Sequence, residues 1–222
     1  MAENQPNFIP IIWQSPSAYF EEPSPNYSSR GSLYGVSGIP HAQFGGTVDV
    51  VGGGTNMYPY YLNAYNSLVN NPSPLAMSVT MESSGYRDVS IVAEVEVTAD
   101  VTTTNNKIIF LLTRHISDDY FCSVVYYADE DFNLTTTGQT DTYESSVTMN
   151  PLWNMEDLTA VVLVQTMSGN HVILQGASSM FSGILPLFTA DRLEGPAGLG
   201  VNFHNSSFPQ IGIDLFEWDF DN

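Results

Sequence analysis

The sequence has very few basic residues. Lysine and arginine together account for 5 of its 222 residues, and 24 acidic residues bring the formal net charge to −19. Such a surface repels phosphate backbones and anionic lipid headgroups, so we expect no nucleic-acid partner. A high net charge also keeps a protein soluble in salty or extracellular surroundings. The composition therefore favours an exported protein, with a protein or glycan ligand at the cell surface as the expected partner.

Cysteine and long apolar runs are also scarce. Cys122 cannot form an intramolecular disulfide, and it lies in the apolar run Tyr120–Val125, so we expect a buried, inert thiol. The sequence has no run of eighteen apolar residues, so we expect no membrane-spanning segment. Met1–Asn7 lacks the features of a signal peptide and is instead typical of the last turn of a helix, so we expect a fragment.

The first 71 residues predict a small unit of helices and strands. Asn26 is a candidate cap of a short helix that ends near Gly35, and Thr55 or Asn56 is a candidate cap of a second helix. A linker rich in asparagine and proline follows at Asn70–Pro74. The predicted elements are a strand at Phe8–Gln14, the short helix, a strand around Gln43–Phe44, and a helix at Met57–Val69.

A glycine-rich turn at Ile39-Pro40 joins the short helix to the next strand. The residue before proline is extended, and a cis peptide is tolerated in such a turn. The run Leu33–Gly46 resembles the Tyr-Gly-Val-x-Gly-Ile-Pro-Thr segment of thioredoxin-like proteins, whose cis-proline loop faces a Cys-x-x-Cys motif. The resemblance implies that the Ile39 backbone would pair with an extended peptide. His41 replaces the usual threonine, and the redox cysteines would lie upstream of this chain.

Residues 73–178 predict an antiparallel sandwich. In Val89–Thr98 every odd position is apolar and most even positions are polar, the pattern of a half-buried strand. About seven such segments suit an immunoglobulin-like fold. The expected strands are Leu75–Met81, Val89–Thr98, Ile108–Thr113, Tyr120–Tyr127, Thr142–Met149, Leu158–Gln165 and His171–Gly176.

The C-terminal residues 187–222 resemble the start of a polycystic-kidney-disease-type (PKD) repeat. The resemblance rests on Gly195–Ser207 and on the Trp-Asp-Phe signature at Trp218–Asn222. Asn150–Leu158 is similar to a recurring Asn-Pro-x-Trp-x-x-Glu-x-Leu segment of modular exported surface proteins of Gram-negative bacteria, of the outer-membrane thioredoxin-plus-sandwich kind. That family resemblance supports the architecture and says little about activity.

Candidate metal sites are limited to acidic clusters. The four histidines are far apart in sequence and none has a second ligand at metal-binding spacing. Calcium prefers clustered carboxylates, so the candidate calcium ligands are Asp129 and Asp131 in one turn and Asp219 and Asp221 near the end of the chain. No Gly-x-Ser-x-Gly motif is present, and paired carboxylates for glycoside cleavage cannot be selected from the sequence.

The sequence predicts a mixed, β-rich protein with three parts. These are an incomplete thioredoxin-like unit (1–71), an immunoglobulin-like β-sandwich (73–178) and the start of a PKD-like second sandwich (187–222). The predicted function is a non-catalytic extracellular or cell-surface module for adhesion or display. Two alternatives stay open: a thiol-disulfide oxidoreductase with Ile39 and Pro40 on its substrate side, and a calcium-stabilised carbohydrate-binding module that uses the tyrosine-rich helix.

Overall fold

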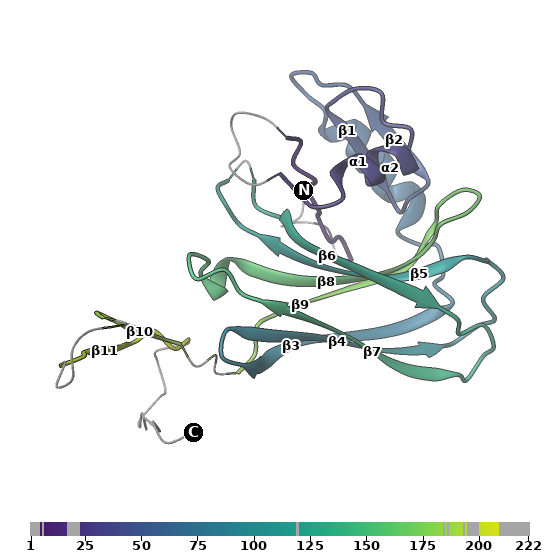
Figure 1. Cartoon of the computed structure of the whole chain (residues 1–222). Helices are drawn as coiled ribbons and strands as arrows, with labels where there is room; N and C mark the ends of the chain where they lie inside the picture. Colours follow the sequence, from purple (N-terminus) through teal and green to yellow (C-terminus); the bar gives the residue numbers. More distant parts are fainter. Residues whose placement is uncertain are drawn as a thin grey trace.

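The chain folds into a β-sandwich that carries a smaller unit of helices and a hairpin (Figure 1). The computed structural model describes residue 5 and residues 7–16, 23–118, 120–183, 185, 187–192, 194 and 200–208. In chain order the elements are α1 (Tyr27–Leu33), β1 (His41–Phe44), β2 (Val48–Val51), α2 (Tyr58–Leu68), β3 (Leu75–Gly85), β4 (Asp88–Val97), β5 (Asn106–Arg114), β6 (Ser123–Phe132), β7 (Thr140–Thr148), a 3₁₀ turn (Met155–Asp157), β8 (Leu158–Thr166), β9 (Ile173–Met180), β10 (Phe188–Ala190) and β11 (Phe203–Asn205).

Strands β3 to β9 form two antiparallel sheets. Within the described residues one sheet has the strand order β3-β4-β7 and the other has the order β6-β5-β8-β9. The β-rich antiparallel sandwich expected from the sequence is therefore confirmed. Each strand predicted within residues 73–178 overlaps an observed one, although β6 begins at Ser123 rather than at Tyr120. Cys122 thus lies in the turn before the strand.

The space between the two sheets is filled by alternate side chains of each strand. In β4 the side chains of Val89, Ile91, Ala93, Val95 and Val97 are buried, whereas Glu94 and Glu96 are exposed. This is the burial that the alternating sequence predicts for a strand with one solvated face. These side chains belong to one inner apolar cluster that also contains residues of the facing sheet.

The central strands β5 and β8 are buried on both faces. Ile108, Phe110 and Leu112 belong to the inner cluster, whereas Ile109 and Leu111 belong to a second apolar cluster on the outer face of the sheet. A run of consecutive apolar residues is the pattern of a strand covered on both sides. The outer face of this sheet therefore needs a cover, and the N-terminal segment provides it.

The segment Phe8–Gln14 covers the outer face without joining the sheet as a regular strand. It makes a single parallel bridge, in which the Ile12 N–H donates to the Cys122 carbonyl oxygen at 2.8 Å and the Val124 N–H donates to the Ile12 carbonyl oxygen at 2.9 Å. The prediction of a full strand here is wrong. Pro10 lacks the N–H that a continuing ladder would need. Ile9, Ile11 and Trp13 nevertheless pack on the outer cluster.

The N-terminal unit consists of the segment Phe8–Gln14, the helices α1 and α2, and the β1–β2 hairpin. Phe44 of β1 packs against Tyr61 of α2, with ring centroids 6.0 Å apart. The turn of the hairpin is tied to the sandwich, because the Ile173 N–H donates to the Gly45 carbonyl oxygen at 2.9 Å. A Cβ atom at Gly46 would lie 2.0 Å from the His171 carbonyl oxygen, so this close approach requires glycine.

The hairpin of β10 and β11 follows the sandwich toward the C-terminus (Figure 1). Leu185 and Phe208 exchange two backbone hydrogen bonds at its base, at 2.8 and 3.0 Å. The Trp218–Asn222 signature lies outside the described residues. Among the helices that the structure describes, none is long and apolar enough to cross a membrane.

Candidate functional site

A large cavity lies where the N-terminal unit meets the outer face of the β6-β5-β8-β9 sheet. Its volume is about 1450 Å³, and its lining comes from the segment before α1, from α1, from the Ile39 loop and β1, from the end of α2, and from β8 and β9. A cavity at a junction between structural units is a common location for a ligand site. The walls are mostly apolar and aromatic, and the only arginine among the described lining residues is Arg30.

Arg30 is buried at this junction, with 6% of its surface exposed. Its Nη1 donates a hydrogen bond to Oε1 of Gln165 at 2.8 Å, and its Nη2 donates to the hydroxyl of Tyr34 at 2.9 Å. The guanidinium carbon lies 5.1 Å from the ring centroid of Trp13 and 5.1 Å from that of Tyr34. Arg30 therefore joins α1 to β8 of the sandwich through contacts with π faces and neutral oxygen atoms.

Gln165 is the partner that the sandwich provides. It is fully buried, and its Nε2 donates to the Tyr34 hydroxyl at 2.6 Å and to the His171 carbonyl oxygen at 2.7 Å. One amide side chain thus accepts from Arg30 and donates to two further oxygens. Because Arg30 and Gln165 are both buried, the loss of one of them would leave hydrogen-bonding groups of the other without a partner.

No carboxylate of the described residues forms an ion pair with Arg30. Removing a guanidinium from water costs several kcal/mol even after relaxation. Each cation–π contact returns about 1–2 kcal/mol when desolvated, and a hydrogen bond to a charged group about 1.5–3 kcal/mol. The cluster therefore offsets much of the cost but leaves the positive charge uncompensated. Within the described part of the chain, the Nε of Arg30, the Nε1 of Trp13 and the Nδ1 of His171 are buried without hydrogen-bond partners.

The Ile39-Pro40 peptide is cis, a geometry that the sequence of this turn tolerates. The carbonyl oxygen of Pro40 accepts a hydrogen bond from the Gly52 N–H at 2.9 Å, which ties the loop to the end of β2. Ile39 borders the cavity and exposes 69% of its surface. The loop is thus presented at the surface of the N-terminal unit, at the rim of the cavity that contains Arg30.

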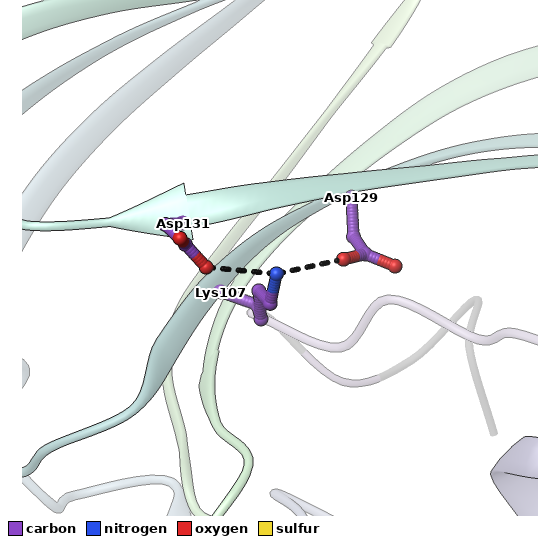
Figure 2. A network of polar contacts seen from close by, with 3 residues as sticks. All are labelled: Lys107, Asp129 and Asp131. Carbon is purple, nitrogen blue, oxygen red and sulfur yellow. Dashed lines mark ion pairs between the residues drawn. The ribbon is translucent and has the colours of Figure 1, made fainter.

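The candidate calcium ligands Asp129 and Asp131 lie together on β6, with Lys107 of the neighbouring strand β5 between them (Figure 2). The Lys107 Nζ is 2.8 Å from Asp131 and 3.3 Å from Asp129. The hydrogen bond to Asp131, followed by that to Asp129, raises the pKa of Lys107. An ammonium group therefore occupies the position between the two carboxylates. The other two candidates, Asp219 and Asp221, lie outside the described residues.

The structure does not bring the four histidines and Cys122 into a metal-binding group. Across the described ranges, no three residues among His, Cys, Asp and Glu converge on one point. His41 lies on β1, with its Nε2 3.3 Å from Oε1 of Gln43. Cys122 is a free, half-buried thiol at the foot of β6, and burial raises its pKa to about 11.

The sequence did not reveal the buried cluster formed by Trp13, Arg30 and Gln165. Arg30 had one available signal, because arginine and lysine are so rare in this chain that each deserves an explanation. Its partner Gln165 is 135 residues away in sequence, in a strand whose other residues are mostly apolar. No local spacing rule connects the two, so only the folded arrangement reveals the cluster.

The reactivity of Cys122 should depend steeply on pH. Burial favours the neutral thiol, so we expect alkylation of the folded chain by iodoacetamide to rise about tenfold per pH unit between pH 7 and 10. In denaturant the rate should level off near the ordinary pKa of 9.0. The pKa of Cys122 is higher in the folded chain than in the unfolded chain, so the protonated thiol contributes to the free energy of unfolding. That contribution is complete below pH 9 and is lost as the pH rises through about 11. A folded-state rate that levels off near pH 8 would contradict this assignment.

No protein-family model and no curated protein sequence matches the chain. Among solved structures the chain is similar to HBP35 of Porphyromonas gingivalis, with a TM-score of 0.50, 11% identity, and coverage of 70% of this chain and 56% of that one. It also matches a domain of the outer membrane lipoprotein Omp28 from Porphyromonas gingivalis, with a TM-score of 0.35, 8% identity, and coverage of 50% and 90%. A calcium-binding mutant of Bacteroides uniformis beta-glucuronidase 2 gives a TM-score of 0.32, 17% identity, and coverage of 53% and 14%.

The similarity to HBP35 concerns the fold alone, because the two sequences are only 11% identical. This chain spans little more than half of the HBP35 chain. The two lower TM-scores support no argument about architecture. The comparisons therefore indicate that a β-rich arrangement similar to this one occurs in a protein of Porphyromonas gingivalis.

Proposed function

We propose that this chain is a non-catalytic module of an exported bacterial cell-surface protein, with a role in adhesion or display. The observation that supports it is the packing of the N-terminal unit on the sandwich. Arg30, Gln165 and the outer apolar cluster fix that unit in place, while the Ile39-Pro40 loop stays exposed. A rigid β-sandwich that presents a loop is a common design for a binding module. The acidic, lysine-poor composition suits an extracellular location.

We propose further that the N-terminal unit is an incomplete thioredoxin-like domain. Its support is the order of a short helix, a cis-proline loop, a two-stranded hairpin and a second helix, which follows the resemblance stated for Leu33–Gly46. On this proposal the parts are 1–71, the immunoglobulin-like sandwich 73–178, and a PKD-like start at 187–222. The β10–β11 hairpin would then be the first pair of strands of the second sandwich.

Cell-surface display predicts that the protein is accessible on intact bacteria. Antibodies raised against residues 73–178 should label intact cells of the source organism about as strongly as permeabilised cells. External protease should remove the signal from intact cells, and a cytoplasmic protein followed in the same samples should stay undigested. Labelling that appears only after permeabilisation would contradict the proposed location.

A thiol-disulfide oxidoreductase is the second candidate, because the resemblance of Leu33–Gly46 implies a substrate-side role for Ile39, and Ile39 is exposed. In this function the loop would pair with a substrate peptide, and a Cys-x-x-Cys motif upstream of residue 1 would carry the chemistry. Cys122 is unsuited to that role, because burial raises its pKa to about 11 and keeps the thiol protonated. Insulin reduction by a chain extended upstream, and by its cysteine-to-serine variants, would distinguish this function from display.

A calcium-stabilised carbohydrate-binding module is the third candidate. Asp129 and Asp131 would be the ligands and the exposed Tyr58 and Tyr60 of α2 would form the stacking face. Calcium would have to displace the ammonium of Lys107, which lies between the two carboxylates. This competition makes the third candidate testable with one substitution.

Lys107→Gln should create a calcium response that the unsubstituted chain shows only weakly. Removal of the ammonium leaves two carboxylates close together, which repel each other and attract a hard cation. In thermal denaturation, 2 mM calcium should raise the melting temperature of the Lys107→Gln variant more than that of the parent chain. The variant with Asp131→Asn added is the control and should lose the response. A parent chain stabilised by calcium as strongly as the variant would instead show that the site already binds the ion.

A further inference from the structure

The junction cavity differs in charge from the rest of the chain. Acidic residues outnumber basic ones by 24 to 5 in the whole sequence, yet none of the described residues that line this cavity is aspartate or glutamate. The lining contains one permanent cation, Arg30, and many apolar side chains. The interior of the cavity is therefore positive and apolar, in a molecule whose net charge is strongly negative.

Arg30 has hydrogen-bonding capacity left over. A guanidinium carries five N–H groups, and the two hydrogen bonds to Gln165 and Tyr34 use two of them. The Nε of Arg30 is buried without a partner, and so is the Nε1 of Trp13, whose ring stacks on the guanidinium and borders the same cavity. Buried donors of this kind are normally satisfied, and both of these belong to residues that line the cavity.

The walls restrict the chemistry of a ligand that could accept hydrogen bonds from these donors. A cation is disfavoured by Arg30, and a small inorganic anion would leave the apolar surface of Ile11, Leu68 and Leu163 uncovered. A molecule that satisfies both features has an anionic group for the guanidinium and an apolar body for the walls. Carboxylates suit arginine well, because the two oxygens match the N–H groups of the guanidinium.

We propose that this cavity binds a small organic carboxylate with an apolar body, whose carboxylate pairs with Arg30. The rings of Trp13 and Tyr34, which both contact the guanidinium, supply aromatic lining of the cavity. The site goes beyond the proposed function, since it depends on the folded chain and is independent of where the protein is located. It also accounts for an arginine buried without a carboxylate among the described residues.

The test compares three ten-carbon amphiphiles on the whole chain by calorimetry, below their micelle-forming concentrations. Decanoate carries the carboxylate, decanol has the same apolar body without charge, and decyltrimethylammonium carries the opposite charge. We expect decanoate to bind at least tenfold more tightly than decanol, and the ammonium compound to bind more weakly than either. Equal affinity for decanoate and decanol would overturn the proposal, as would the absence of decanoate binding.

Arg30→Gln should abolish the preference for decanoate, so that the ratio of decanoate affinity to decanol affinity in this variant falls from tenfold or more to about one. Arg192→Gln is the matched control, because it removes the same charge from an exposed position outside the cavity. It should bind decanoate like the parent chain. Decanoate binding that survives Arg30→Gln at full strength would overturn the role of Arg30.

Arg30 also supports the fold, so a second variant keeps the proposal testable if Arg30→Gln does not fold. A Cβ atom at Gly31 meets only Val36 Cβ, at 3.9 Å, so position 31 of α1 has room for a Cβ atom, and we choose Gly31→Leu. It adds bulk at the cavity lining and keeps the charge of Arg30. We expect it to weaken decanoate and decanol binding alike, by about fivefold or more. Unchanged affinity for both in this variant would show that they bind elsewhere and would overturn the proposal.

Discussion

The two central strands of the larger sheet, β5 and β8, must be covered on both faces. Their consecutive apolar residues point alternately into the sandwich and away from it, and both sets are buried. The β3-β4-β7 sheet covers one face. The other face would expose Ile109, Leu111 and Leu163 to water if the N-terminal segment were absent, which is the kind of apolar patch that soluble proteins avoid. The N-terminal unit therefore packs as part of the sandwich and is not a separate, independently packed domain.

This cover is held by a polar cluster as well as by apolar contacts. Apolar packing alone is non-directional, whereas the hydrogen bonds of Gln165 to Arg30, Tyr34 and the His171 carbonyl fix one orientation. The buried guanidinium has a cost, which the aromatic rings offset in part. The same arrangement leaves a positive, apolar cavity in an acidic protein, so the constraint that positions the N-terminal unit also creates the most distinctive chemical site of the described residues.

Much of the sandwich could be predicted, because its signal is local. The alternation in Val89–Thr98 and the apolar run at Ile108–Thr113 indicated strands, and the turn at Ile39-Pro40 was one in which a cis peptide is tolerated. Phe8–Gln14 has the composition of a strand, but its position on the sheet depends on a surface more than a hundred residues away. The segment therefore pairs through Ile12 alone.

The candidate site was harder to predict than the fold. Asp129 and Asp131 were found from sequence as an acidic pair, but the position of Lys107 between them follows from the register of β5 with β6. Arg30 and Gln165 carry no motif, and their contact depends on how the N-terminal unit sits on the sheet. Sequence patterns reveal which faces are apolar, whereas a buried polar pair between distant elements becomes visible only when both elements are placed.

Native-state hydrogen exchange of the Gln165→Met variant tests the central claim that this polar cluster fixes the N-terminal unit on the sandwich. The amides of Ile12 and Ile173 are the reporters, because each donates across the junction, to the carbonyl oxygens of Cys122 and Gly45. The substitution leaves the Nη1 of the buried Arg30 without its acceptor, and among the described residues only the bond from its Nη2 to the Tyr34 hydroxyl remains. We therefore expect these two amides to lose about 2–3 kcal/mol of protection, while amides in β4 keep theirs. Equal protection of Ile12 and Ile173 in the parent and variant chains would contradict the claim, and would mean that apolar contacts alone hold the unit in place.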